Sequence, residues 1–211
     1  MGFDIYGMNP QLNEEYPPRF EEIIKEYGTA DGYLDWKKEI PEEIRDEYHS
    51  LKDNFNDDNP GTYFRNNVWF WRPLWNFVCD TCGDFLTDKD MGGGDTNDGY
   101  AISKTKAQKI AAKLREAIDS GVCERIEKDY KKKAEEARKH NVKIEAELEQ
   151  INADCKAKHG NLVPREYPEP YKTQWNDAYS RKSWTDSYPF SVENIKNFAN
   201  FCEQSGGFEI C

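Results

Sequence analysis

The chain has 211 residues, of which 37% are hydrophobic, 14% aromatic and 33% charged. This length favours one domain of medium size, and the aromatic content supplies a core, which excludes a fully disordered chain. The net charge of −11 is unevenly distributed: residues 11–60 carry 15 acidic and 6 basic residues, whereas residues 103–160 carry 11 acidic and 15 basic ones.

An acidic surface of this kind repels nucleic acid and membranes and attracts basic partners or metal ions. We therefore expect no direct nucleic-acid contact. No apolar run reaches the roughly 20 residues of a membrane helix, and the first residues, MGFDIYGMNP, lack the pattern of a signal peptide. These features predict a cytoplasmic protein that does not enter a membrane.

The two ends of the chain carry the same short pattern. Phe3 and Ile5 alternate with polar residues, as strands do, and residues 207–211 repeat the order Gly-Phe-acid-Ile. We expect two terminal strands that pair, with Asp4 and Glu209 on the face opposite the buried side chains. Directly opposed carboxylates would destabilise this sheet unless they were staggered or neutralised.

The acidic section is predicted to be helical. Prolines precede one helical pattern over residues 18–27 and a second over residues 41–54. Turn-forming residues at 56–61 close the section. We interpret residues 11–60 as an acidic helical insertion within a single domain of residues 1–211.

Residues 62–82 are the most apolar segment, and their spacing predicts a helix buried on most sides. Pro73 removes a main-chain hydrogen bond, so we expect a kink or two consecutive helices there. Cys79 and Cys82 have the spacing of metal ligands, but no second pair of Cys or His accompanies them. Reduced, metal-free thiols are therefore the expectation, with zinc as the less favoured alternative and no cofactor predicted.

The second half alternates between charged and aromatic stretches. A capping Ser103 predicts a helix that stops near Gly121, and sparse apolar positions over 122–158 predict a protruding charged helix or helical hairpin. A homodimer through this helix is an open alternative. The proline-broken aromatic segment 160–186 is expected to drape over the core, before a last helix that begins after Ser191. The predicted fold class is α+β and predominantly helical, with a small sheet of the terminal strands.

Polar side chains inside the most apolar segment are the candidate ligand-binding residues, because a buried guanidinium or amide is costly unless it is paired or faces a cavity. One interpretation pairs the arginines with acids of residues 11–60. In the other interpretation these residues line a ligand pocket. Arginine binds a phosphate or carboxylate of the ligand, asparagine forms hydrogen bonds with its polar edge, and tryptophan stacks on its planar ring. The candidates are Arg65, Asn66, Asn67, Trp69 and Arg72, with Asn97, Asp98 and Tyr100 at the rim.

The sequence indicates no catalytic constellation. The three histidines lie apart from any nucleophile, and the glycine-rich residues 92–99 lack the strand and the Lys-Ser/Thr ending of a phosphate-binding loop. Acidic residues are too numerous to single out an acid–base pair. A binding protein is therefore favoured over an enzyme.

Four motifs resemble those of a family of small uncharacterised proteins carried by phages and prophages. They are MGFDIYGMNP at the start, YFRNNVWFWRPLW at 63–75, NDG at 97–99, and YPFSVEN at 188–194 with SGGFEIC at the end. The resemblance covers both ends and residues 61–120. Members often have paired C-x-x-C knuckles before the last helix, where this chain has only Cys123 and Cys155.

The resemblance implies a phage-borne protein that acts by binding inside the host cell. Our first hypothesis is a counter-defence factor that sequesters a nucleotide-like anionic ligand, which predicts buried arginines facing a cavity. The alternative is an acidic nucleic-acid mimic that inhibits a host protein, which predicts a continuous exposed acidic surface. A third is a metal-dependent enzyme acting on phosphate esters, which predicts clustered carboxylates.

Overall fold

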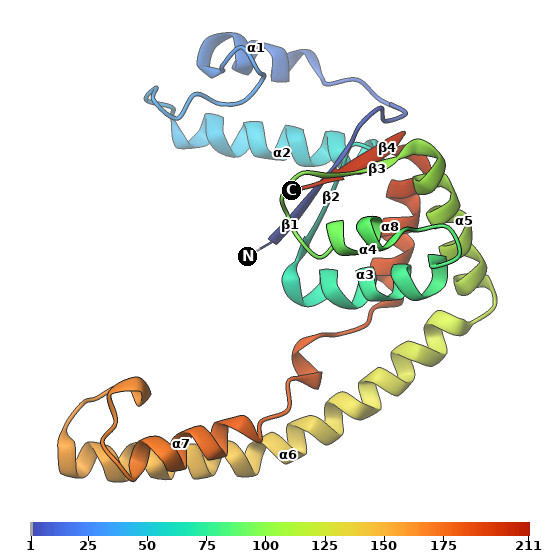
Figure 1. The fold of residues 1–211 in the computed structure, drawn as a ribbon. Coiled ribbons are helices and arrows are strands. Elements are labelled where there is room, and N and C mark those ends of the chain that lie inside the picture. The colour runs from blue at the N-terminus through green and yellow to red at the C-terminus, as the bar shows by residue number, and fades with distance from the viewer. Residues whose placement is uncertain (1) are drawn as a thin grey trace. The chain divides into compact units, whose positions relative to one another are not determined.

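The computed structural model describes residues 2–211 and has an α+β fold (Figure 1). The chain forms two compact units, residues 2–120 with 192–211 and residues 121–191. Among the residues described, no helix combines the length and the apolar character needed to span a membrane.

A four-stranded antiparallel sheet is the centre of the first unit, in the order β2-β1-β4-β3. Its strands are β1 (Gly2–Gly7), β2 (Tyr63–Asn67), β3 (Tyr100–Ser103) and β4 (Gly207–Ile210). The terminal strands β1 and β4 are the central pair, which confirms the predicted sheet. Glu209 pairs with Tyr6, while Asp4 exchanges main-chain hydrogen bonds with Cys211, so the two carboxylates are staggered. The edge strands β2 and β3 were not predicted.

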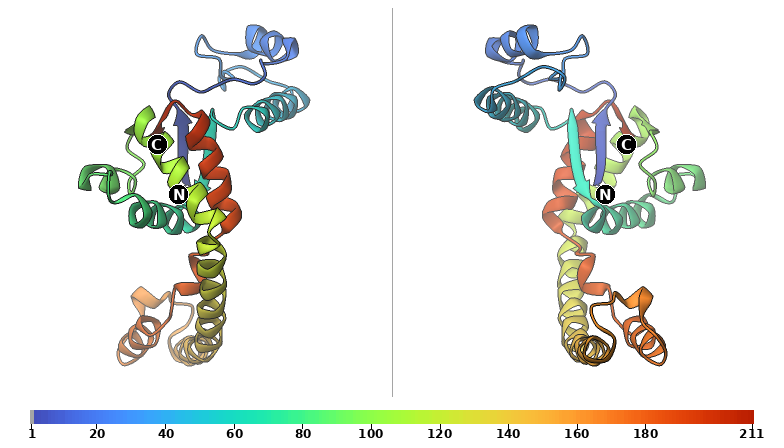
Figure 2. Two further views of the ribbon diagram at one scale, coloured as in Figure 1. Left: turned by 90° about the vertical axis from the view of Figure 1, so that its right-hand side faces the viewer. Right: turned by 90° about the vertical axis from the view of Figure 1, so that its left-hand side faces the viewer.

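Helices cover one face of this sheet (Figure 1). They are α3 (Val68–Cys82), α5 (Lys104–Asp119) and α8 (Val192–Gln204), with the short α4 (Asp88–Gly93) beside them. Phe3 and Ile5 of β1 meet Phe208 and Ile210 of β4 in the core, and all four are buried. The side views in Figure 2 show α8 along β1 and β2.

The predicted helix over residues 62–82 is wrong in its first part. Residues 63–67 are strand β2, and the helix begins only at Val68. The helix begins there because Asn67 is its N-cap residue. The side-chain oxygen of Asn67 accepts hydrogen bonds from the main-chain nitrogens of Trp69 (3.0 Å) and Phe70 (3.1 Å). Pro73 lies within one helix, which does not divide into two.

The acidic section folds into α1 (Pro18–Tyr27) and α2 (Glu42–Asp58). It has an apolar cluster of its own, composed of Phe20, Ile23, Leu34, Ile40 and Tyr48. Buried Asn59 ties the end of α2 to the preceding chain, since its side-chain oxygen accepts from the main-chain nitrogens of Asn13 (2.7 Å) and Glu14 (3.0 Å). The two helices are therefore a folded hairpin rather than loose chain.

The second unit is built on one long helix, α6 (Val122–His159), so the helix and not the hairpin is the correct alternative. The short helices η1 (Pro164–Glu166), α7 (Tyr171–Ser180) and η2 (Thr185–Ser187) follow. Tyr167, Tyr171 and Ala178 form a separate apolar cluster with Ile144 and Leu148 of α6. The expectation that residues 160–186 drape over the main core is thus wrong.

Candidate functional site

Arg65, the first predicted ligand-binding residue, is exposed. Its relative side-chain accessibility is 68%, and its Nε lies 3.5 Å from Oδ1 of Asp4 on the neighbouring strand. Successive side chains of a strand point to opposite faces, so Arg65 lies on the face away from the helices. The predicted burial of this guanidinium is therefore wrong, and its partner is Asp4 rather than an acid of residues 11–60.

The four neighbouring candidates have different environments. Asn66 is buried, and its Nδ2 donates to Oδ1 of Asn194 on α8 at 3.0 Å. Asn67 caps α3, while Trp69 and Arg72 are exposed in the first two turns of that helix. Capping and an amide–amide contact account for the two asparagines, so the structure does not gather these residues around one cavity.

The three predicted rim residues also separate. Asn97 and Asp98 are exposed before β3, with Nδ2 of Asn97 at 3.5 Å from the main-chain oxygen of Gly2. The hydroxyl of Tyr100 instead donates to Oδ1 of Asp90 at 3.2 Å. Tyr100 thus belongs to a different polar cluster.

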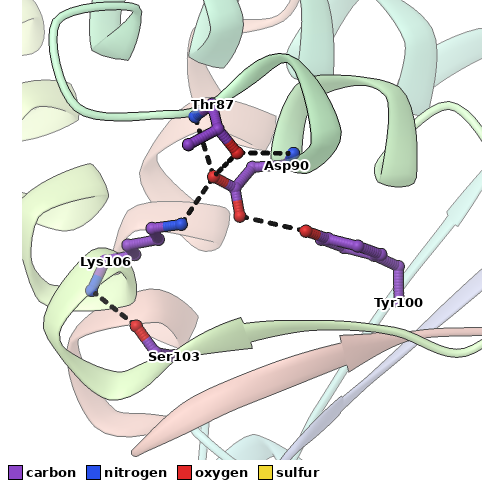
Figure 3. Close-up of polar contacts among 5 residues, drawn as sticks. All are labelled: Thr87, Asp90, Tyr100, Ser103 and Lys106. Carbon is purple, nitrogen blue, oxygen red and sulfur yellow. Dashed lines mark hydrogen bonds and ion pairs between the residues drawn. The ribbon is translucent and has the colours of Figure 1, made fainter.

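Asp90 is the centre of that cluster and is buried, with 3% of its surface exposed (Figure 3). Its Oδ2 accepts from Nζ of Lys106 at 2.5 Å, and from the hydroxyl (2.6 Å) and main-chain nitrogen (2.8 Å) of Thr87. The hydroxyl of Thr87 accepts in return from the nitrogen of Asp90 at 3.2 Å, which completes a capping box at α4.

Burial alone would raise the pKa of Asp90, but the hydrogen bonds from Lys106, Thr87 and Tyr100 outweigh it and lower the pKa to about 2. Both carboxylate oxygens accept hydrogen bonds, from the N-cap residue of α4 and from residues of β3 and α5. A carboxylate that is ionised and fully hydrogen-bonded has no free position for a substrate proton. We therefore assign this cluster to holding α4 against the sheet. The Thr87-x-x-Asp90 spacing is the sequence signal that would have found it.

A groove of about 480 Å³ lies beside β2 and contains Arg65. Its walls come from the end of α2, the first half of β2 and the exposed side of α8. Four asparagines line it: Asn56, Asn194, Asn197 and Asn200. Its charged lining residues are Arg65 and Asp57, so asparagine side chains make up most of the polar lining of the groove. The Asn-x-x-Asn-x-x-Asn spacing of α8 is the sequence signal for this groove, and none of its three asparagines is among the predicted site residues.

The acidic section presents its charge outward. Of its 15 acidic residues, 13 are exposed and only Asp35 and Glu47 are partly covered. Within residues 11–60, which the structure describes completely, Arg19 makes the ion pairs, to Glu22 at 3.2 Å and to Glu47 at 2.8 Å. Most of the negative charge is thus left for solvent or a partner.

The thiols of the C-x-x-C motif are neutral at physiological pH. Burial raises the pKa of Cys79 to about 11 and that of Cys82 to about 12, and nearby acids add to the effect. All six cysteines are free. Among residues 2–211 no three His, Cys, Asp or Glu side chains are grouped closely enough to share a metal ion.

No family model matches this chain, and neither a curated protein nor a solved structure is significantly similar to it.

Proposed function

We propose that this protein acts by binding another protein, with the acidic α1–α2 section docking on a basic surface that otherwise holds nucleic acid. The observation that carries this proposal is the exposure of 13 of the 15 acidic residues of that section. Clustered exposed charge of one sign speeds encounter with a surface of the opposite sign and excludes partners of like charge.

The acids of α2 are arranged in a stripe. Glu42, Asp46, Asp53 and Asp57 fall within about 60° of arc on a helix of 3.6 residues per turn. Packing of the α1–α2 hairpin on its own apolar cluster holds this stripe in place. A fixed row of carboxylates can replace a row of phosphates at Lys and Arg side chains of a partner.

The geometry gives less support to the anionic ligand that the sequence analysis placed first. The groove beside β2 has one lining cation, Arg65, and this is already next to Asp4. Asp57 lines the same groove, so a bound anion would also meet a carboxylate. The one cation and the one anion of the lining offset each other, so the groove gives a nucleotide with several negative charges no net attraction.

The motif resemblance to phage-carried proteins guides the choice of partner: we propose a nucleic-acid-binding protein of the host. The test is affinity capture from host cells with the parent and with the stripe variant Glu42→Gln/Asp46→Asn/Asp53→Asn. A protein bound through the stripe is retained by the parent, is released by salt or competing duplex DNA, and is lost with the variant.

A matched control neutralises three exposed acids of α6 instead, as Glu124→Gln/Glu136→Gln/Glu149→Gln. This control changes the net charge equally and should retain the partner. If both variants lose the captured partner equally, binding depends on the total charge of the protein and not on the stripe. Equal retention in both would exclude the stripe as the docking surface.

A further inference from the structure

We infer that the free edge of β2 binds an extended segment of a partner protein by strand addition, in the groove beside α8. The site lies on the sheet and shares with the acidic stripe only Asp57, which the stripe variant leaves unchanged. The inference therefore stands or fails independently of the function proposed above.

Hydrogen-bond alternation shows which main-chain groups of β2 are free. The nitrogen of Gly7 donates to the oxygen of Thr62 at 2.9 Å, and β1 pairs with β2 in continuous register. Bonded pairs alternate along an antiparallel ladder, so Phe64 and Asn66 bond to β1. The main-chain N–H and C=O groups of Tyr63 and Arg65 consequently point away from the sheet.

These groups have no hydrogen-bond partner in the part of the chain that the structure describes. Among residues 2–211, no side chain or loop forms a hydrogen bond with the main chain of Tyr63 or Arg65. Both residues, with Phe64, line the groove of about 480 Å³ instead. An open strand edge beside a groove is a template for another strand, and proteins usually cover such edges or interrupt them.

The spacing of the free groups selects the occupant. Donors and acceptors that recur every second residue, about 6.8 Å apart, match the main chain of an extended polypeptide. Neither a nucleotide nor a sugar repeats both donor and acceptor at this interval. An added strand would therefore use its main chain for affinity and its alternating side chains for specificity.

Side chains of the added strand that point toward the helices would meet the asparagines of α8. Asn194 and Asn200 are held by Asn66 and Arg115, whereas Asn197 is exposed and makes no hydrogen bond among the residues described. Small polar side chains fit this wall. On the opposite face, an acidic side chain across from Arg65 adds a favourable cross-strand pair. The partner segment is thus extended and polar, with an acid at one position.

The test begins with the full chain and a displayed library of random peptides. Selected peptides should bind with a Kd below about 100 µM. Hydrogen exchange measured by NMR should show that the amides of Tyr63 and Arg65 become protected when peptide binds, because they are the donors to the added strand. The stripe variant of α2 should bind these peptides as the parent does.

Two substitutions at one position separate the main chain from the side chain. Arg65→Ala removes the guanidinium but keeps the outward N–H, and it should weaken peptide binding less than about fivefold. Arg65→Pro also removes the N–H and should weaken binding more than about tenfold. Proline is tolerated at an edge position whose N–H is unpaired, and melting curves check that both variants fold.

Three results would overturn the inference. The first is a library that yields no peptide of the stated affinity, and the second is an equal loss of binding with alanine and with proline, which indicates a side-chain site. Protection of Tyr63 and Arg65 that rises with protein concentration, without peptide, would assign the edge to a second copy of the chain. If Arg65→Pro fails to fold, hydrogen exchange in the parent still tests the inference: the amides of Tyr63 and Arg65 must become protected when peptide binds.

Discussion

Asp90 illustrates at the level of one residue how a buried charge can stabilise a fold. Its pKa of about 2 lies below the usual value for aspartate, so the folded state favours the ionised form. This contribution is present above about pH 5 and disappears as the pH falls toward 2, and it amounts to about 2 kcal/mol. Lys106, whose Nζ is 2.5 Å away, supplies the opposite charge.

We predict that Asp90→Asn lowers the free energy of unfolding at pH 7. The difference in this free energy between the parent and the variant should decrease by about 2 kcal/mol as the pH falls from 6 to 2. The amide cannot form the ion pair at any pH, whereas the parent loses it on protonation. Urea unfolding at several pH values measures the gap. The exposed Asp88→Asn serves as control and should stay within about 0.5 kcal/mol of the parent throughout. A pH-independent gap for Asp90→Asn would contradict the assigned ionisation.

At the level of elements, the tryptophans of α3 hold the second half of α4 and the residue that follows it. Nε1 of Trp71 donates to the main-chain oxygen of Gly94 at 2.7 Å, and Nε1 of Trp75 donates to that of Met91 at 2.8 Å. A Cβ atom on Gly94 would lie 1.9 Å from the ring of Trp75, which is fully buried. Residue 94 must therefore be glycine for packing reasons.

Gly94→Ala should destabilise the protein by about 3 kcal/mol, because either the buried ring or the main chain has to move. Gly92 provides the matched control: it lies in α4, and an added Cβ would have no atom within 4 Å. Gly92→Ala should be neutral or stabilising by up to about 1 kcal/mol through helix propensity. Thermal unfolding of both variants tests the contrast, and similar melting temperatures would show that the ring does not confine residue 94.

The elements also show what could be predicted from sequence. Long periodic patterns and caps placed α1, α5 and α8 well, and the repeated pattern at the two termini predicted their pairing. Strand β2 was missed because its aromatic residues continue the helical spacing of α3, and the cap at Asn67 that separates them is visible only as one asparagine among several. β3 has only four residues, too few for a clear alternation.

The candidate site depended on this missed boundary. In a helix Arg65 would have been buried, whereas in an edge strand it faces solvent beside Asp4. The groove is formed by segments more than 100 residues apart, and no local pattern reveals that α8 lies along β2. The exposed acidic surface was predictable, because high charge density in amphipathic helices requires it.

At the level of the whole molecule, the acidic section lies in the connection between two paired strands, β1 and β2. β1 ends at Gly7 and β2 begins at Tyr63, and the two strands are antiparallel neighbours that a short turn could connect. The ends of the insertion meet at Gln204: the nitrogen of Gln11 donates to its main-chain oxygen at 2.8 Å, and a Cβ on Gly61 would lie 2.5 Å from its main chain.

We predict that replacing residues 12–60 with a short Gly-Ser-Gly linker leaves the four-stranded sheet folded. The apolar cluster of the α1–α2 hairpin consists only of residues from that section, so its removal opens no gap beside Trp71 and Trp75. Near-UV circular dichroism of the tryptophans and slow amide exchange in β1 and β4 measure the retained fold. Loss of both signals would mean that the insertion is part of the main core. If the variant folds but no longer captures the basic partner, the binding surface lies in the deleted section. The deletion removes the acidic stripe of α2 and the negative charge around it, while the sheet remains.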